Sequence, residues 1–407
     1  MMVFATEKNR IEKEPILTRN FFCTFMAQFS CALVMYTLMT TIGEYVTSFG
    51  ATAMIAGMVS GMYVFGGLFS RLISGQLLEI YGWKRIALIF LILHFLASCC
   101  YFLADNVTLL VIVRFIHGLG FGAASNAIMV IGMASLPKSR YSEATGYFML
   151  STSLAIAFGP YVGGKIFDMF GGTGSFITAS FLSFLCVLFM SFADTKNLEA
   201  TKPIGKEKEK PKTPKGIYSF IEPKVIPIAL SIFCLSFGYA ALLSFYRLYA
   251  IELNMLKEFS IFFLIYAVVL LFSRPLAGKI QDRFGDHAVC IPSMIFQVTG
   301  LVLIAWKPSI VTIVLCAAFG ALGYGTLNSS LNSIVNRSVT NERRPFAVST
   351  YWAACDFGVG IGPMLLGAVV TWIGYREMYF VAAGLSLVAL PIYLYASWKK
   401  KPEIKEA

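Results

Sequence analysis

Ionisable side chains are rare inside the long apolar stretches of this 407-residue chain, so those that occur there are the first candidates for chemistry. Asp356 is the only carboxylate near the middle of any apolar stretch long enough to span a membrane. A carboxylate in a low-dielectric environment can exchange a proton near neutral pH. Asp356 is therefore our candidate proton carrier. A direct contact to a cationic substrate and a structural hydrogen bond to a neighbouring helix are the alternatives.

Two other polar features interrupt apolar stretches. Arg114 lies about seven residues inside one of them, where a charge is costly unless it is paired or faces water. Its alternative is to extend toward the membrane surface. Asn328, Asn332 and Asn336 recur at every fourth position and share one helical face. Such a stripe either bonds neighbouring helices or lines a watery cavity.

Other chemistry finds no support in the sequence. The nine cysteines fall in apolar stretches without C-x-x-C or Cys/His metal spacing, and the three histidines are scattered. No G-x-x-x-x-G-K-[ST] phosphate loop occurs, and no nucleophile–base set is visible. We therefore expect no enzyme, no metal and no cofactor.

The composition places these residues in a membrane. Apolar residues make up 57% of the chain, charged residues 14%, and the mean hydropathy is +0.72, which predicts an all-α polytopic membrane protein. Twelve apolar segments have spanning length. Their predicted bounds are 20–43, 51–74, 86–104, 107–134, 143–166, 174–193, 225–249, 258–279, 288–306, 308–335, 344–372 and 376–397.

Charge sets the predicted topology. Residues 1–19 and 398–407 form polar tails, and residues 194–224 form a hydrophilic linker between the segments 20–193 and 225–397. Most lysines and arginines lie in the tails, the linker and the loops on that same side, which predicts that both termini are cytoplasmic. This topology accounts for the net charge of +11, so nucleic acid is not an expected partner.

The chain contains an internal repeat. A shift of 203 residues places Arg71, Gly75, Glu79 and Gly82 on Arg274, Gly278, Asp282 and Gly285. The same shift places Gly159-Pro160 on Gly362-Pro363 and Tyr36 on Tyr239. We therefore predict two pseudo-symmetric six-helix bundles, related by an axis along the membrane normal.

One apolar segment is rich in glycine. Small residues allow another helix to approach closely, and Pro160 should kink the helix. This predicts a tightly packed, bendable seam in the first half, with a partial copy in the second. The seam residues are Gly146, Gly159, Pro160, Gly163 and Gly164, and their counterparts are Gly358, Gly362, Pro363 and Gly367.

These motifs resemble those of a known family. The loop at residues 75–85 is similar to the G-x-x-x-D-R-x-G-R-R signature of the major facilitator superfamily, which it matches at Gly75, Gly82, Lys84 and Arg85. It differs from the signature in having Glu79 for Asp and Ile80 where a basic residue is usual. Its second copy keeps Asp282 and Arg283. The Arg114 segment resembles the R-x-x-x-G-x-G pattern of that family, and the Gly146–Gly164 segment resembles the helix 5 motif of its drug:proton antiporter branch, with Ala155 for one glycine.

The resemblance implies roles for individual residues. Arg114 would be a charge that lines the cavity and biases Asp356. A cytoplasmic gate would comprise Arg71, Gly75, Glu79, Gly82, Lys84, Arg85, Arg274, Gly278, Asp282 and Arg283. The alternative for its charged residues is that they anchor the cytoplasmic side and form a salt bridge at a helix end. The substrate cavity would be lined by Ser125, Asn126, Asn328 and Asn332. Aromatic side chains are further candidates for the cavity because they can stack on a ligand, and helix packing or a place at the membrane interface is their alternative: Tyr36, Tyr239, Tyr266, Tyr351 and Trp352. Glu44, at an external helix end, is interpreted as part of a solvated loop, and Lys165 with Asp168 as an interfacial pair.

We therefore predict a monomeric secondary transporter of the plasma membrane that works by alternating access in the lipid bilayer. The helix 5 resemblance favours export of a small organic compound in exchange for protons. An exporter of an endogenous metabolite or metallophore and a proton-coupled importer are the alternatives within transport. A non-transporting membrane sensor is the alternative from another class.

Overall fold

We describe residues 15–137, 141–195, 221–259, 261–339 and 343–398 of the chain from a computed structural model. These ranges are almost entirely helical and contain no strand. Most of the predicted tails and of the predicted linker lies outside them. The helices are α1 (Arg19–Thr47), α2 (Ala53–Tyr81), α3 (Trp83–Cys100), η1 (Tyr101–Leu103), α4 (Val107–Ala134), α5 (Tyr141–Phe192), η4 (Pro223–Val225), α7 (Ile226–Glu252), α8 (Leu256–Phe259), α9 (Phe262–Phe284), α10 (His287–Trp306), α11 (Ile310–Gly320), η5 (Ala321–Gly325), α12 (Thr326–Arg337), α13 (Arg344–Ile373) and α14 (Tyr375–Trp398).

Eleven apolar helical stretches of the described chain are long enough to cross a membrane. One of them belongs to α5, which is two helices joined at Gly171, where φ is 64° and ψ is −158°. Only glycine adopts such a backbone conformation without strain. Counted as two, α5 completes the set of twelve, and the predicted twelve-helix fold is confirmed.

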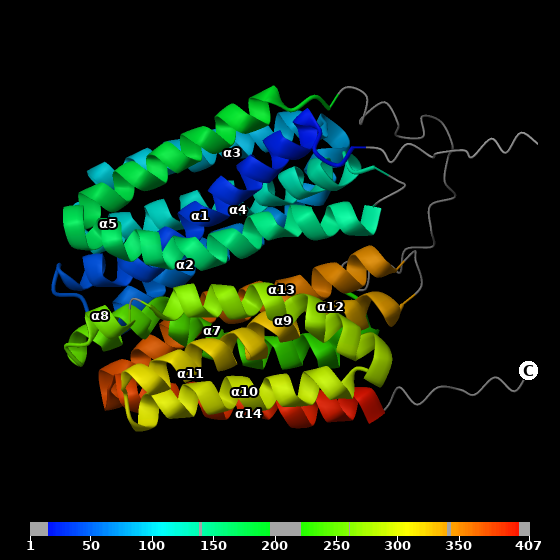
Figure 1. Ribbon diagram of the computed structural model, residues 1–407. Coiled ribbons are helices and arrows are strands. Elements are labelled where there is room, and N and C mark those ends of the chain that lie inside the picture. Colours follow the sequence, from blue (N-terminus) through cyan, green and yellow to red (C-terminus); the bar gives the residue numbers. More distant parts are fainter. Residues whose placement is uncertain (1–14, 138–140, 196–220, 260, 340–342, 399–407) are drawn as a thin grey trace, which may run out of the picture.

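The helices form two bundles, one from α1–α5 and one from α7–α14 (Figure 1). The start of α1 and the end of α14 lie at the same end of the molecule, on the right in Figure 1, which we name the terminal end. The other end is named the distal end. Large apolar side chains such as Phe69, Phe272 and Trp372 are exposed on the helices, as expected of a surface that faces lipid.

The internal repeat recurs in the backbone. Gly82 and Gly285, which are 203 positions apart, have φ values of 89° and 87°. Gly171 and Gly374 are separated by the same shift and have φ values of 64° and 94°. Equivalent turns therefore occur at equivalent places in the two bundles, as expected for duplicated halves.

Candidate functional site

An ion pair joins the two bundles near the middle of their helices. Nη1 of Arg71 on α2 contacts Oδ2 of Asp356 on α13. At a rise of about 1.5 Å per residue, Arg71 lies ~15 Å from the end of α2 at Tyr81, and Asp356 ~18 Å from the start of α13 at Arg344. The side chains are 29% and 19% exposed. Pairing reduces the cost of placing both charges at this depth.

The repeat makes a second contact of the same kind. Arg274 on α9 donates from Nη1 to Oγ of Ser153 on α5 at 2.8 Å, and from Nε to the carbonyl of Gly325 at 3.4 Å. The 203-residue shift takes Arg71 to Arg274 and Ser153 to Asp356. The same inter-bundle contact is thus present twice, once with a carboxylate and once with a hydroxyl group. Both arginines lie at mid-helix, away from the helix ends where the gate is predicted.

A third inter-bundle contact lies at the distal end. Arg247 on α7 pairs with Glu44 on α1 and, at 2.5 Å, with Asp168 on α5. The Arg247 side chain is only 13% exposed. Glu44 therefore binds the other bundle instead of lying in a solvated loop, and the described partner of Asp168 is Arg247 rather than Lys165. Arg247 and Asp168 line a pocket together with Thr40 and Tyr246.

Close glycine contacts tighten the same distal half. A Cβ atom on Gly57 of α2 would stand 2.0 Å from the carbonyl oxygen of Pro363, and one on Gly61 would stand 2.1 Å from that of Gly360 on α13. Gly367 likewise packs against the backbone of Ala53. At these glycine positions no side chain separates α2 from α13, so their backbones touch directly.

The predicted seam packs within the first bundle. A Cβ atom on Gly159 would stand 2.5 Å from Cβ of Tyr36, and one on Gly163 would stand 2.6 Å from the carbonyl oxygen of Thr37, so α5 lies tightly on α1. Their neighbour Gly164 faces Arg247 of the other bundle. In the second bundle, Gly358 and Gly362 pack on α7. The surroundings of Gly146 are outside the described part of the structure.

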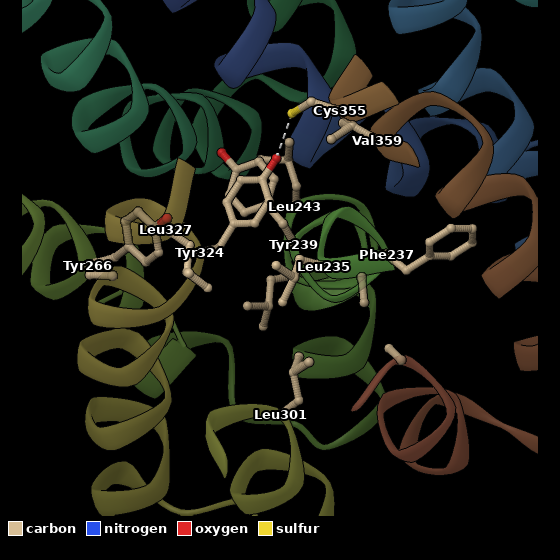
Figure 2. Close-up of a cluster of buried hydrophobic side chains, with 14 of the residues drawn as sticks. Leu235, Phe237, Tyr239, Leu243, Tyr266, Leu301, Tyr324, Leu327, Cys355 and Val359 are labelled. Atoms are coloured by element: carbon tan, nitrogen blue, oxygen red, sulfur yellow. Dashed lines mark hydrogen bonds between the residues drawn. The ribbon is translucent and has the colours of Figure 1, made fainter. Parts of the chain in front are cut away.

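Tyr239, Tyr266 and Tyr324 lie in a cluster of buried side chains that also contains Cys355, the neighbour of Asp356 in the chain (Figure 2). Tyr239 of α7 stacks on Tyr324 of η5, with ring centroids 4.2 Å apart, and the Tyr324 hydroxyl group lies 3.1 Å from Sγ of Cys355. Tyr36 is close enough to Tyr239, Arg274 and Asp356 for their groups to act on its hydroxyl group. The structure therefore brings these predicted cavity residues together from both bundles.

Tyr324 belongs to this group, although the sequence did not single it out. It lies in the Gly323-Tyr-Gly325 segment, which repeats Gly120-Phe-Gly122, and in a π-helical turn of the kind often found at functional sites. The repeat and the paired glycines could have marked it.

The comparisons with known proteins agree with the repeat and the fold. The Major Facilitator Superfamily model matches residues 24–273 and again residues 228–407. The chain belongs to the Major Facilitator Superfamily. It is a transporter and not an enzyme.

The transporter is similar to three proteins that cover nearly its whole length. An MFS-type transporter of Methanocaldococcus jannaschii is 23% identical over 91% of this chain and 96% of its own. The multidrug resistance protein MdtG of Salmonella typhi is 26% identical over 94% of this chain and 96% of its own. The crystal structure of a bacterial homologue of the human lysosomal transporter Spinster, inward-facing and unoccupied, matches with a TM-score of 0.74 at 13% identity and covers 95% of this chain and 98% of its own.

The remaining predicted cavity residues of the transporter have partners within their own bundles. Tyr351 donates to the carbonyl of Asn328 at 3.0 Å and packs edge-on against Trp352. Nδ2 of Asn126 donates to Ser74 at 2.7 Å. Contacts for the others are as follows: Ser125 with the Gly122 carbonyl, Asn332 with Asn336, and Tyr266 with Phe262.

Arg114 is fully buried inside the first bundle of the transporter. Its guanidinium group donates to the carbonyls of Val59 and Ser60 at 3.2 Å each and lies over the ring of Tyr63 at 4.7 Å. The described contacts therefore do not join Arg114 to Asp356, whose ionic partner is Arg71.

The described gate residues at the terminal end of the transporter have no close neighbours, are exposed, or are bonded within their own bundle. No atom lies within 4 Å of a Cβ atom built on Gly75 or Gly278. Nζ of Lys84 donates to the carbonyl of Ser191 at 2.8 Å, at the end of α5. Arg85, Asp282 and Arg283 are exposed, Gly82 has the positive φ noted above, and the side chain of Glu79 is outside the described part.

Proposed function

We propose that this transporter exports a small organic compound in exchange for protons, and that Asp356 is the group that carries the proton. The observation that supports this proposal is the Arg71–Asp356 pair, which ties α2 to α13 near the middle of the membrane. A proton on Asp356 would remove its charge and weaken the pair. Protonation would then be linked to the separation of the bundles.

The other inter-bundle contacts fit alternating access. We propose that the terminal end is cytoplasmic, because lysines and arginines concentrate in the tails, the linker and the loops of that end. The distal end would then be external, and the Glu44–Arg247–Asp168 contacts would close the path to the outside. The name of MdtG as a multidrug resistance protein favours export, and the plasma membrane is the expected location.

The proton gradient can supply enough energy for this exchange. One elementary charge that crosses ~100 mV provides ~2.3 kcal/mol. At about 1.4 kcal/mol per tenfold ratio, this sustains a roughly fortyfold concentration gradient of the exported compound.

The proposal can be tested in proteoliposomes. A compound is first found by screening for thermal stabilisation, and its flux is then followed together with internal pH under an imposed pH gradient. In the wild type, proton movement should accompany the flux, whereas Asp356→Asn should bind the compound but lose the coupled proton movement. Asp105→Asn, which neutralises an exposed carboxylate next to Asn106 in a loop, is the matched control. No substrate-linked proton movement, or unchanged coupling in Asp356→Asn, would refute the proposal.

A further inference from the structure

The two copies of the inter-bundle arginine contact, Arg71–Asp356 and Arg274–Ser153, differ in the charge of the partner of the arginine. The charge of Arg71 is balanced by Asp356, because the two form an ion pair. The position equivalent to Asp356 in the first bundle is Ser153, and its neutral hydroxyl group is the inter-bundle partner of Arg274. The other described partner of Arg274 is the Gly325 carbonyl, which is also neutral. Among the described residues, Arg274 therefore has no carboxylate partner.

An unbalanced guanidinium group is costly at this depth. Arg274 lies ~15 Å from the end of α9 at Phe284, at the same level as Arg71 in α2. Charges inside membrane spans pair with one another or face a water-filled path, and they commonly mark the path of a substrate. Arg114 does not balance Arg274, because it is also cationic and is enclosed in the first bundle.

Tyrosines lie near this unbalanced charge. The Tyr266 hydroxyl group lies 3.1 Å from a Cβ atom built on Gly325, whose carbonyl accepts from Arg274. Tyr36 of α1 lies within range of the charge of Arg274. The stacked pair of Tyr239 and Tyr324 lies beside Tyr36. A planar guanidinium group binds a carboxylate through two parallel hydrogen bonds, and tyrosine rings provide large apolar contact areas.

We propose that Arg274 binds a negatively charged group of the transported compound, and that the compound is an organic monoanion whose apolar or aromatic part rests on these tyrosines. This inference deepens the proposed export function and rests on it. The substrate would do for Arg274 what Asp356 does for Arg71, because each supplies the anion that pairs with the arginine. Proton and substrate would then bind at equivalent places in the two halves.

The inference is tested first by binding without any gradient. Thermal stabilisation of the purified transporter is measured with aryl and alkyl carboxylates, including 2-naphthoate, each beside its matched amide and amine. Carboxylates should bind at least tenfold more tightly than their amides. Arg274→Gln should remove this preference, whereas Lys279→Gln, which neutralises an exposed cation on the same helix, should retain it.

A second variant addresses the folding of Arg274→Gln. Ser153→Asp keeps Arg274 and supplies the missing carboxylate, so the protein should fold. Because the new carboxylate competes with the ligand for Arg274, the affinity for carboxylate ligands should fall at least tenfold. Ser153→Ala removes only the hydroxyl group and should keep the preference. Equal or tighter binding of amides or amines, or unchanged carboxylate binding in Ser153→Asp, would overturn the inference.

Flux measurements separate this inference from the proposed function. Exchange of one inward proton for one outward monoanion moves two charges, so an inside-negative potassium diffusion potential should accelerate it. Exchange of a proton for a monovalent cation moves no net charge and should not respond. Carboxylate-selective binding with flux that moves no protons would refute only the proposed function. Proton-linked flux of a neutral or cationic compound would refute only this inference.

Discussion

Replacing Gly61 by alanine should hinder closure of the distal end. The added Cβ atom would stand 2.1 Å from the carbonyl oxygen of Gly360, whereas ordinary contact begins near 3.4 Å, so α2 and α13 would have to separate by more than an ångström. Both partners are backbone at this contact, and neither can rotate away. Alanine also favours the helix by ~0.5–1 kcal/mol, but this gain applies to every conformation in which α2 is helical and cancels between them.

The cost should appear as a shift in the population of conformations. Overpacking of a close contact costs about 1–3 kcal/mol. Because this cost falls only on the form in which α2 and α13 touch, it should disfavour that form by roughly 5–150-fold.

Thiol labelling measures this shift. Thr40 lines the distal pocket and is only 5% exposed, so a cysteine at this position in a cysteine-free background should react slowly with a maleimide. In Gly61→Ala the reaction should accelerate by up to the same factor. Gly384→Ala is the matched control, because no atom lies within 4 Å of its added Cβ. A folded Gly61→Ala protein that labels at the wild-type rate would show that the contact does not limit opening.

Two further predictions concern the buried charges. Glu44→Arg and Arg247→Glu should each speed labelling at position 40, because each places like charges together. The double exchange should restore slow labelling only in part, because Asp168 would then face a new carboxylate. If the effects of the two substitutions on the labelling rate were fully independent, the pairing would be contradicted. Arg114→Met, of similar length, should unfold within a few degrees of the wild type, because Arg114 contacts carbonyls and a ring but no carboxylate; a large loss of thermal stability would show that these bonds hold the first bundle together.

The spans and the repeat could be predicted because each rests on a simple physical constraint. A bilayer of fixed thickness requires apolar helices of nearly fixed length, and these can be counted in the sequence. A duplicated chain must place its glycine turns at one fixed offset, as Gly82 and Gly285 do. Hydropathy was less informative about helix ends. The apolar pattern predicts that the second span ends at residue 74, whereas helix α2 continues to Tyr81.

The longer helix bears on the interpretation of Arg71. Arg71 precedes Gly75 of the predicted loop by four residues, and this spacing favours a place in the cytoplasmic gate. The helix continues for two more turns, so Arg71 lies at mid-helix and reaches Asp356. Asp356 itself could be found from the sequence because a lone carboxylate in an apolar stretch is conspicuous. Its partner could not, since the two residues are 285 positions apart and no local pattern relates them.

The repeat gives a way to find such partners. Residues near the pseudo-symmetry axis meet their own copies, and Glu44 and Arg247, which are 203 positions apart, form such a pair with opposite charges. Contacts away from the axis must instead occur twice, as Arg71–Asp356 and Arg274–Ser153 do. Two identical halves could only repeat the same charges at both places. A pair of opposite charges on the axis, and a carboxylate in only one of two equivalent contacts, therefore require that the halves diverged after duplication. Under the proposed exchange of a proton for an organic anion, the positions where the halves differ in charge are the ones that would distinguish the proton from the substrate.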